Sequence, residues 1–232
     1  MPTPRLFLAR HGETAWTLTG QHTGVSEIPL TPHGETQVTL SSAALIGPSK
    51  HIDPANLTKI YISPRIRARR TAELLIPDTR ATEVIFDERV REWGYGRYEG
   101  LRPKEILADR RRRGLVVEGF SIWKDGCEDS VDGFGIGKGE SPKGIEARID
   151  EIIKEIRGIQ GGGIEAGRGD VDILIVSHGH YLRAFTKRWL GFSLDFPLTM
   201  VLEPGGIATL TYAHNNVNEP ALLLGGTFRP GE

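Results

Sequence analysis

Six short apolar runs, each of strand length, recur along the chain and are separated by longer segments of mixed polarity. The runs are nearly continuous in apolar residues rather than alternating, which is typical of strands covered on both faces. Strands that alternate with helices favour a mostly parallel sheet between two helical layers. We therefore predict an α/β fold, a three-layer αβα sandwich, with strands at Arg5–Ala9, Lys59–Ile62, Glu83–Phe86, Val171–Ser177, Ile207–Tyr212 and Ala221–Leu224.

Three helix starts are marked by a hydroxyl residue followed by proline. A serine or threonine caps the free N–H groups of a first turn, and proline is well tolerated at the first helical position. The three pairs are Thr31-Pro32, Ser63-Pro64 and Ser141-Pro142. The third start precedes a stripe of isoleucines at helical spacing, which should face the sheet: Ile145, Ile149, Ile152, Ile153 and Ile156.

Turn signals and glycines organise the rest of the chain. Asn215-Asn216 predicts a turn between the last two strands, which would then be antiparallel. The stretch Asp132–Gly139 resembles a phosphate loop, but no strand precedes it and no G-K-[ST] closes it, so we expect a surface loop near the site. Gly161–Gly163 is interpreted as a helix-to-strand linker. With no internal repeat, we predict a single domain spanning residues 1–232.

Composition narrows the class of protein. The chain has 232 residues, a formal net charge of −1 and one cysteine, Cys127, which excludes an internal disulfide. No apolar N-terminal stretch resembles a signal peptide or a membrane span. We expect a cytoplasmic protein that binds neither nucleic acid nor membrane, and homo-oligomerisation stays open. The basic run at residues 110–113 is interpreted as a solvated helix end, with a nuclear signal or a phosphate contact as the alternatives.

Two strands end in a histidine followed by glycine. The first strand leads into Arg10-His11-Gly12, and the fourth leads into His178-Gly179. Strand ends in α/β sheets border the crevice where ligands bind. A glycine after the histidine permits a sharp turn and the close approach of a bulky group to the imidazole. An arginine beside a histidine suits an anion, above all phosphate.

Two further blocks supply complementary chemistry. One is the arginine-rich segment 65–70, and the other is the loop 91–100, which presents Glu92 among aromatic residues and glycines. Each block alone also fits a structural role, since arginine-rich helix starts are often solvated and a carboxylate can cap a helix. The presence of all four blocks in one chain favours a shared site.

These blocks resemble the histidine phosphatase superfamily, which has the phosphoglycerate mutase-like fold. The resemblance implies that His11 is the nucleophile and that Glu92 is the proton donor. It also implies that Arg10 and Arg67 bind phosphoryl oxygens and that His178 is the second histidine of the pocket. Further implied substrate-binding residues are Thr17, where many members have asparagine, Thr23, Gly24, Tyr95 and Gly179.

Less common strings carry a closer resemblance, to the fungal sedoheptulose-1,7-bisphosphatase branch of this family. They lie at residues 91–100, 122–128 and 212–222, whereas the connection 189–205 is short for that branch. A sugar bisphosphate needs a second anion site beyond the catalytic pocket. The candidates are Arg69, Arg102 and Arg183, with surface salt bridges as the alternative role of each.

The chemistry expected from these residues is hydrolysis of a phosphomonoester in two steps. Neutral His11 would attack phosphorus, while Glu92 would protonate the leaving oxygen and later activate water. No aspartate cluster of the kind that holds magnesium occurs in the four blocks, so we expect catalysis without metal or cofactor. The expected partner is a small phosphorylated metabolite. A phosphoglycerate mutase, a phosphoprotein phosphatase and a non-catalytic phosphate-binding protein remain as alternatives.

Overall fold

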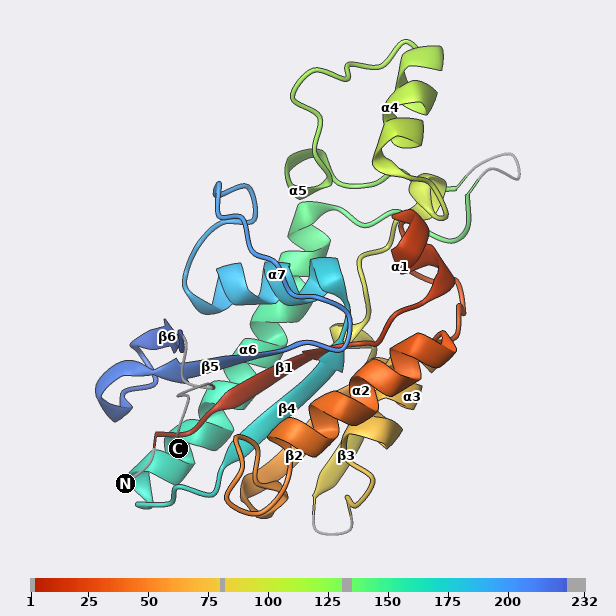
Figure 1. Ribbon diagram of the computed structural model, residues 1–232. Coiled ribbons are helices and arrows are strands. Elements are labelled where there is room, and N and C mark those ends of the chain that lie inside the picture. The colour runs from red at the N-terminus through yellow and green to blue at the C-terminus, as the bar shows by residue number, and fades with distance from the viewer. Residues whose placement is uncertain (1–2, 80–81, 131–134, 225–232) are drawn as a thin grey trace.

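The computed structural model describes residues 3–79, 82–130 and 135–224, and a six-stranded sheet forms their centre (Figure 1). The strand order is β3-β2-β4-β1-β5-β6. Strands β1 to β4 are parallel, while β5 is antiparallel to both β1 and β6. The strands are β1 Leu6–Arg10, β2 Leu57–Ile62, β3 Glu83–Phe86, β4 Asp172–Ser177, β5 Ile207–Tyr212 and β6 Pro220–Leu222. The predicted α/β class is confirmed, as are the antiparallel last two strands.

Helices cover both faces of this sheet (Figure 1). Helices α2 (Pro32–Leu45) and α3 (Ile66–Leu75) pack on one face, and α6 (Pro142–Glu165) and α7 (Gly179–Trp189) pack on the other. The side chains of β1 alternate between the two cores, as a strand period of two requires. Leu8 belongs to the core that contains the predicted isoleucine stripe of α6, all of which is buried.

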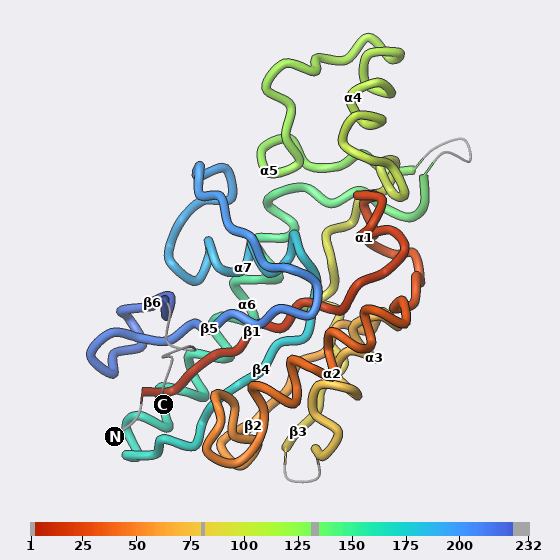
Figure 2. The backbone as a smooth tube through the Cα atoms, viewed as in Figure 1, coloured from red at the N-terminus to blue at the C-terminus, as the bar shows by residue number. Residues whose placement is uncertain are grey.

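The remaining helices are short and lie mostly at one end of the sheet. Figure 2 shows α4 (Pro103–Arg112) and α5 (Ile122–Asp125) beyond the carboxyl ends of the parallel strands, where α1 (Ala15–Thr19) also lies. These short helices and the loops next to them cover this end of the sheet. The described part of the chain also contains four 3-10 turns: η1 Pro54–Asn56, η2 Glu88–Val90, η3 Gly96–Tyr98 and η4 Ala213–Asn215.

The predicted caps are correct for two of the three helices. Thr31 and Ser141 each accept a hydrogen bond from the backbone N–H three residues later, at the starts of α2 and α6. The prediction for Ser63 is wrong, because α3 begins at Ile66 and its N-terminal residue makes no side-chain cap. The Ser63 hydroxyl instead lies 2.7 Å from Nε2 of His178, a partner that the local sequence does not reveal.

The interpretation of Gly161–Gly163 as a linker is also wrong, because these glycines form the last turns of α6. Glycine lowers helix stability, so a tertiary contact must compensate for it. Gly163 is buried against Val171, and a Cβ atom at residue 163 would lie 2.6 Å from the Val171 Cγ2 atom. The missing side chain lets the end of α6 approach the start of β4.

The arginine run at the end of α4 is only partly solvated, which corrects that prediction. Arg110 and Arg113 pair with Glu128, and the Arg110 guanidinium lies 3.9 Å from the centre of the Phe120 ring. Arg112 is more exposed and pairs with Asp109 at 3.4 Å. The run therefore fastens α4 to the chain beneath it. Among the described residues, no helix is long and apolar enough to cross a membrane.

Substitution by alanine should affect stability differently at two neighbouring glycines of α6, because their surroundings differ. Gly162→Ala should raise the free energy of unfolding by about 0.5–1 kcal/mol, because nothing lies near the added methyl group and alanine favours helix. Gly163→Ala should leave the protein about 1–3 kcal/mol less stable than Gly162→Ala, because the methyl group overlaps Val171. Urea unfolding of the two variants checks this, and equal stabilities would contradict the close contact.

Candidate active site

The register of two parallel strands brings the two predicted histidines together. Arg10 at the end of β1 pairs with Ser177 at the end of β4, so the next residue of each strand is a histidine. The His11 N–H donates to the Ser177 carbonyl at 3.0 Å, and the centres of the His11 and His178 rings are 5.1 Å apart. The strand ends thus form the floor of one site, as expected from the sequence.

The glycines that follow the two histidines have roles other than the predicted one. A Cβ atom at Gly12 would lie 2.7 Å from the carbonyl oxygen of Gly34 in α2. A Cβ atom at Gly179 would lie 3.3 Å from the guanidinium carbon of Arg10. Gly12 therefore permits the close approach of a helix rather than of a ligand, and Gly179 leaves room for an arginine.

The hydrogen bonding of His11 fixes which ring nitrogen carries the proton. Nδ1 lies 2.8 Å from the carbonyl oxygen of Gly12, which can only accept, so Nδ1 carries the hydrogen and Nε2 keeps its lone pair. Burial holds the pKa of His11 well below its ordinary value, and the nearby Arg67 charge lowers it further. The ring is therefore neutral at neutral pH, with a free nucleophilic nitrogen.

A buried chain of hydrogen bonds fixes His178 in the same way. Arg67 Nε has only a hydrogen to offer, so the 3.2 Å contact makes His178 Nδ1 the acceptor. Nε2 then carries the hydrogen and donates it to the Ser63 Oγ atom at 2.7 Å. The hydroxyl hydrogen of Ser63 has no acceptor among the described residues. The sequence analysis missed Ser63 because its proline neighbour indicated a helix cap.

The rest of the Arg67 side chain organises a loop rather than facing the cavity. Its Nη1 donates to the carbonyl of Ser26 at 2.8 Å, and its Nη2 donates to the carbonyls of Thr23 and Gly24 at 2.9 and 3.1 Å. Burial lowers the pKa of this guanidinium. Four of the five Arg67 N–H groups thus donate to the protein, and Arg67 is not among the residues that line the cavity, so its contact with phosphate stays a prediction.

Glu92 is held by the first turn of a helix. Its Oε1 accepts from the Trp93 N–H at 2.9 Å and from the Tyr181 N–H at 2.8 Å, while Oε2 accepts from the His180 N–H at 3.0 Å. The first N–H groups of α7 have no partner within the helix, so a carboxylate is stabilised there. Glu92 is buried and its carboxylate borders the same cavity as His11.

A second buried arginine supports the backbone of the Glu92 loop. Arg148 of α6 donates to the carbonyls of Arg89, Arg91 and Glu92 at 2.8, 2.9 and 3.2 Å. The same guanidinium pairs with the buried carboxylate of Glu140 at 2.8 Å, which balances its charge. The sequence indicated α6 but gave no sign that one of its arginines supports the site.

The cavity itself has a volume of about 250 Å³ and is open at the carboxyl end of the sheet. Arg10 is one of its cations: its buried Nε has no hydrogen-bond partner among the described residues, and its Nη1 donates to the Leu202 carbonyl at 2.7 Å. The predicted residues that line this cavity are Arg10, His11, Thr17, Thr23, Glu92, Tyr95, Gly179 and Arg183.

The remaining predicted residues lie behind or away from the cavity. Gly24 is buried behind it and donates its N–H to Glu99. Two candidates for a second anion site are not among the residues that line it, although Pro103, next to Arg102, lines it. Arg69 packs 5.1 Å over the Phe86 ring at the edge of the sheet, and Arg102 pairs with its helical neighbour Glu105. Of the three candidates, Arg183 is the one whose side chain lines the cavity.

Thr17 lines the cavity, but its hydroxyl already has partners. It accepts from the Thr14 N–H at 2.9 Å and donates to the Thr14 carbonyl at 2.8 Å, which caps α1. A hydroxyl has one hydrogen, so Thr17 cannot also donate to phosphate in this conformation. The family resemblance suggested only that Thr17 replaces an asparagine, and the local sequence did not indicate that Thr17 caps a helix.

Two histidines that the sequence analysis did not assign form one wall of the cavity. The rings of His22 and His180 stack with centres 5.4 Å apart, and the Tyr95 hydroxyl lies 2.7 Å from Nδ1 of His180. Burial lowers the pKa of His180 well below its ordinary value. His180 stands two residues after His178 on the first turn of α7, and this closeness to a predicted site residue could have indicated its place in the wall. His22 belongs to no motif.

The glycine-rich stretch does not border this cavity as far as it is described. Residues 132–134 lie outside the described residues, whereas Gly139 pairs with Tyr95 and the Ile136 N–H donates to the Gly96 carbonyl. The stretch therefore packs behind the Glu92 loop. Within the described residues, no group of three or more histidine, cysteine, aspartate or glutamate side chains is arranged to hold a metal ion.

These features agree with the comparison to known proteins. Residues 6–221 match the model of the histidine phosphatase superfamily (branch 1), so the chain belongs to this family and is a histidine phosphatase superfamily enzyme. It is 35% identical to sedoheptulose 1,7-bisphosphatase of Saccharomyces cerevisiae, across 97% of this chain and 94% of the yeast protein. It is 32% identical to an acid phosphatase of Mycobacterium tuberculosis, across 97% and 95%.

Solved structures show the same fold. The Mycobacterium tuberculosis protein Rv3214 superimposes with a TM-score of 0.71 at 29% identity, covering 97% of each chain. The mycobacterial glucosyl-3-phosphoglycerate phosphatase Rv2419c superimposes with a TM-score of 0.69 at 22% identity, covering 97% of this chain and all of its own. The phosphoglycerate mutase-like architecture that the sequence implied is thereby confirmed.

The buried neutral histidines predict that stability falls in mild acid. Below about pH 6.5 the unfolded chain binds a proton on each histidine, but His11, His178 and His180 stay neutral when folded. Each of them should therefore contribute a loss of up to about 1.4 kcal/mol per pH unit as the pH falls further. Urea unfolding from about pH 7.5 to about pH 5.5 measures the slope.

Substitution of one of these histidines tests the cause. The slope should be shallower in His180→Asn, because this variant has one buried neutral imidazole fewer. His33→Asn, on the exposed surface of α2, serves as the control. The explanation fails if the slope of His180→Asn equals that of the unchanged chain.

Proposed function

We propose that this enzyme hydrolyses phosphomonoesters of small sugar phosphates through a phosphohistidine on His11. The proposal depends above all on the protonation state of that ring: Nε2 is unprotonated in a neutral imidazole that borders the cavity. Glu92 and the unsatisfied donor of Arg10 border the same cavity. A nucleophile, a carboxyl group and a free cation thus face one small space.

The first step transfers the phosphoryl group to the protein. The lone pair of His11 Nε2 forms a bond to phosphorus as the bond between phosphorus and the sugar oxygen breaks. Glu92 in its protonated form gives its proton to that oxygen, which leaves as an alcohol. Arg10 stabilises the charge on the phosphoryl oxygens.

The second step restores the enzyme. The Glu92 carboxylate takes a proton from a water molecule, whose oxygen attacks phosphorus while the bond from phosphorus to Nε2 breaks. The products are inorganic phosphate, neutral His11 and protonated Glu92. Since every proton taken from Glu92 in the first step returns in the second, the cycle needs no other co-reactant.

Sedoheptulose 1,7-bisphosphate or a related sugar bisphosphate is the substrate we propose. The yeast relative with this activity in its name aligns over nearly the whole chain. Its alignment runs over 265 positions, more than the 232 residues here, so the yeast protein has segments that this chain lacks. A cavity of about 250 Å³ suits a sugar phosphate better than a folded phosphoprotein.

A panel of phosphate esters tests this choice. Phosphate release is measured in the presence of a chelator from sedoheptulose 1,7-bisphosphate, fructose 1,6-bisphosphate, sugar monophosphates, 3-phosphoglycerate and a phosphopeptide. We expect the highest kcat/KM for a sugar bisphosphate, with no loss of activity in the chelator. Exchange of phosphate between phosphoglycerates without release would instead identify a mutase, and a preference for the phosphopeptide would refute the proposed substrate class.

The role assigned to Glu92 predicts a dependence on the leaving group. Glu92→Gln keeps the shape of the side chain but cannot give a proton, so kcat for sugar phosphates should fall by about 10²–10⁴-fold. Nitrophenyl phosphate should lose much less activity, because nitrophenolate leaves without a proton. His11→Ala should abolish turnover of both esters and the acid-labile phosphoenzyme. An equal loss on both esters in Glu92→Gln would contradict the assignment.

A further inference from the structure

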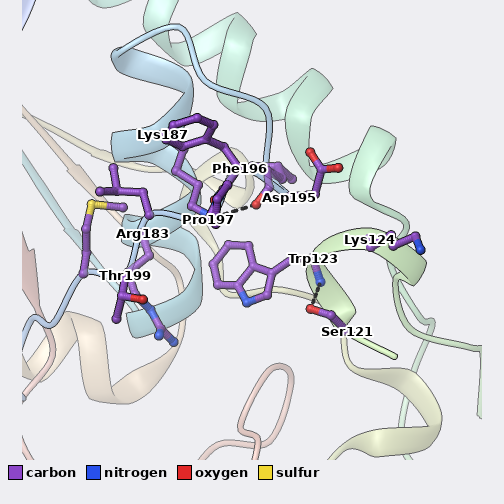
Figure 3. Close-up of a pocket in the computed structure, with 12 residues that line it drawn as sticks. Ser121, Trp123, Lys124, Arg183, Lys187, Asp195, Phe196, Pro197 and Thr199 are labelled. Atoms are coloured by element: carbon purple, nitrogen blue, oxygen red, sulfur yellow. Dashed lines mark hydrogen bonds between the residues drawn. The ribbon is translucent and has the colours of Figure 1, made fainter. Parts of the chain in front are cut away.

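A second cleft, larger than the catalytic cavity, lies beside it and has no role in the chemistry above. It has a volume of about 530 Å³ and lies between the segment 121–124 around α5 and the segment 194–200 that follows α7 (Figure 3). Both segments lie beyond the carboxyl ends of the parallel strands (Figure 1). The cleft therefore opens on the same side of the molecule as the catalytic cavity.

Arg183 joins the two spaces, because its side chain lines both of them. Its Nε donates to the Gly179 carbonyl at 3.0 Å, one helical turn earlier, which fixes the guanidinium plane. Its two terminal nitrogens make no hydrogen bond or ion pair with any described residue. The partly buried guanidinium thus keeps two nitrogens for a ligand that extends from one space into the other.

The charges around the cleft favour an anion. Arg183, Lys187 and Lys124 line it and are opposed by a single carboxylate, that of Asp195. Lys187 is buried and donates to the carbonyls of Leu194 and Phe196 at 2.7 and 2.8 Å, so it fixes the outer segment while adding its charge. Two positive charges remain in excess, which matches a phosphoryl dianion.

Trp123 contributes an aromatic surface to the cleft, beside the apolar residues of the segment 194–200. Figure 3 shows its indole between Arg183 and Lys124. The Arg183 guanidinium and the Lys187 ammonium lie 5.5 and 4.7 Å from the centre of the indole, and the centre of the His180 ring lies 5.5 Å from it. Aromatic rings therefore continue from the wall of the catalytic cavity into the cleft, a surface suited to the carbon chain of a sugar.

We infer that this cleft is the subsite for the distal phosphoryl group of a sugar bisphosphate whose other phosphoryl group lies at His11. Arg183 binds the distal group with its free nitrogens, Lys124 contributes from the exposed rim, and Trp123 packs against the carbon chain. The inference rests on the proposed function and deepens it. Of the three arginines predicted for a second anion site it uses Arg183, because Arg69 and Arg102 line neither space.

Binding to an inactive chain tests the subsite apart from hydrolysis. In a His11→Asn background, calorimetry gives the Kd of fructose 1,6-bisphosphate and of fructose 1-phosphate, which lacks only the distal group. The readout is the ratio of the two Kd values. Arg183→Gln and Lys124→Glu should each lower the preference for the bisphosphate by about tenfold, because each removes a cation that contacts the distal group.

A matched charge change serves as the control. Lys154→Glu, on the exposed side of α6 and outside the cleft, should leave the preference within about twofold of the parent. The subsite is refuted if the parent shows no preference for the bisphosphate, or if Lys154→Glu lowers it as much as Lys124→Glu does. Failure of the proposed function is seen separately, as absence of phosphate release from either sugar by the unchanged chain.

Discussion

The pairing of β1 with β4 is the constraint on which the rest of the site depends. Because Arg10 stands opposite Ser177, the two parallel strands end at the same level and deliver His11 and His178 side by side. A slip of one residue would turn every side chain of a strand to the other face. Both strands are buried on two sides by separate cores, so such a slip would also place wrong residues in both of them.

Buried guanidinium groups then fix the loops that surround the histidines. Arg67 binds three carbonyls of the segment 23–26 as well as His178, and Arg148 binds three carbonyls of the Glu92 loop. A buried charge is costly unless it is paired and hydrogen-bonded, so each arginine stabilises only one arrangement of its loop. Arginine suits this task because its planar fork donates in several fixed directions.

Burial also sets the chemistry of the histidines. The same removal from water that stabilises the core lowers the pKa of His11, so the nucleophile is neutral when the protein is folded. The carbonyl of Gly12 then selects the nitrogen that carries the proton. Because the buried ring stays neutral while the unfolded chain binds a proton in mild acid, the folded protein becomes less stable there.

The sequence by itself determined the strands, the α/β class, the family and the residues at the two strand ends, because apolar runs and short motifs are local. It did not reveal that Ser63 binds His178 or that Arg67 and Arg148 hold loops, since each partner lies far along the chain. It also did not reveal that Gly163 lies within a helix, where the absence of a side chain permits the contact with Val171. Only the tertiary structure showed that Arg183 lines the cavity, whereas Arg69 and Arg102 do not. All three are arginines in or next to the observed helices α3, α4 and α7, and the direction in which a helix packs depends on the whole core.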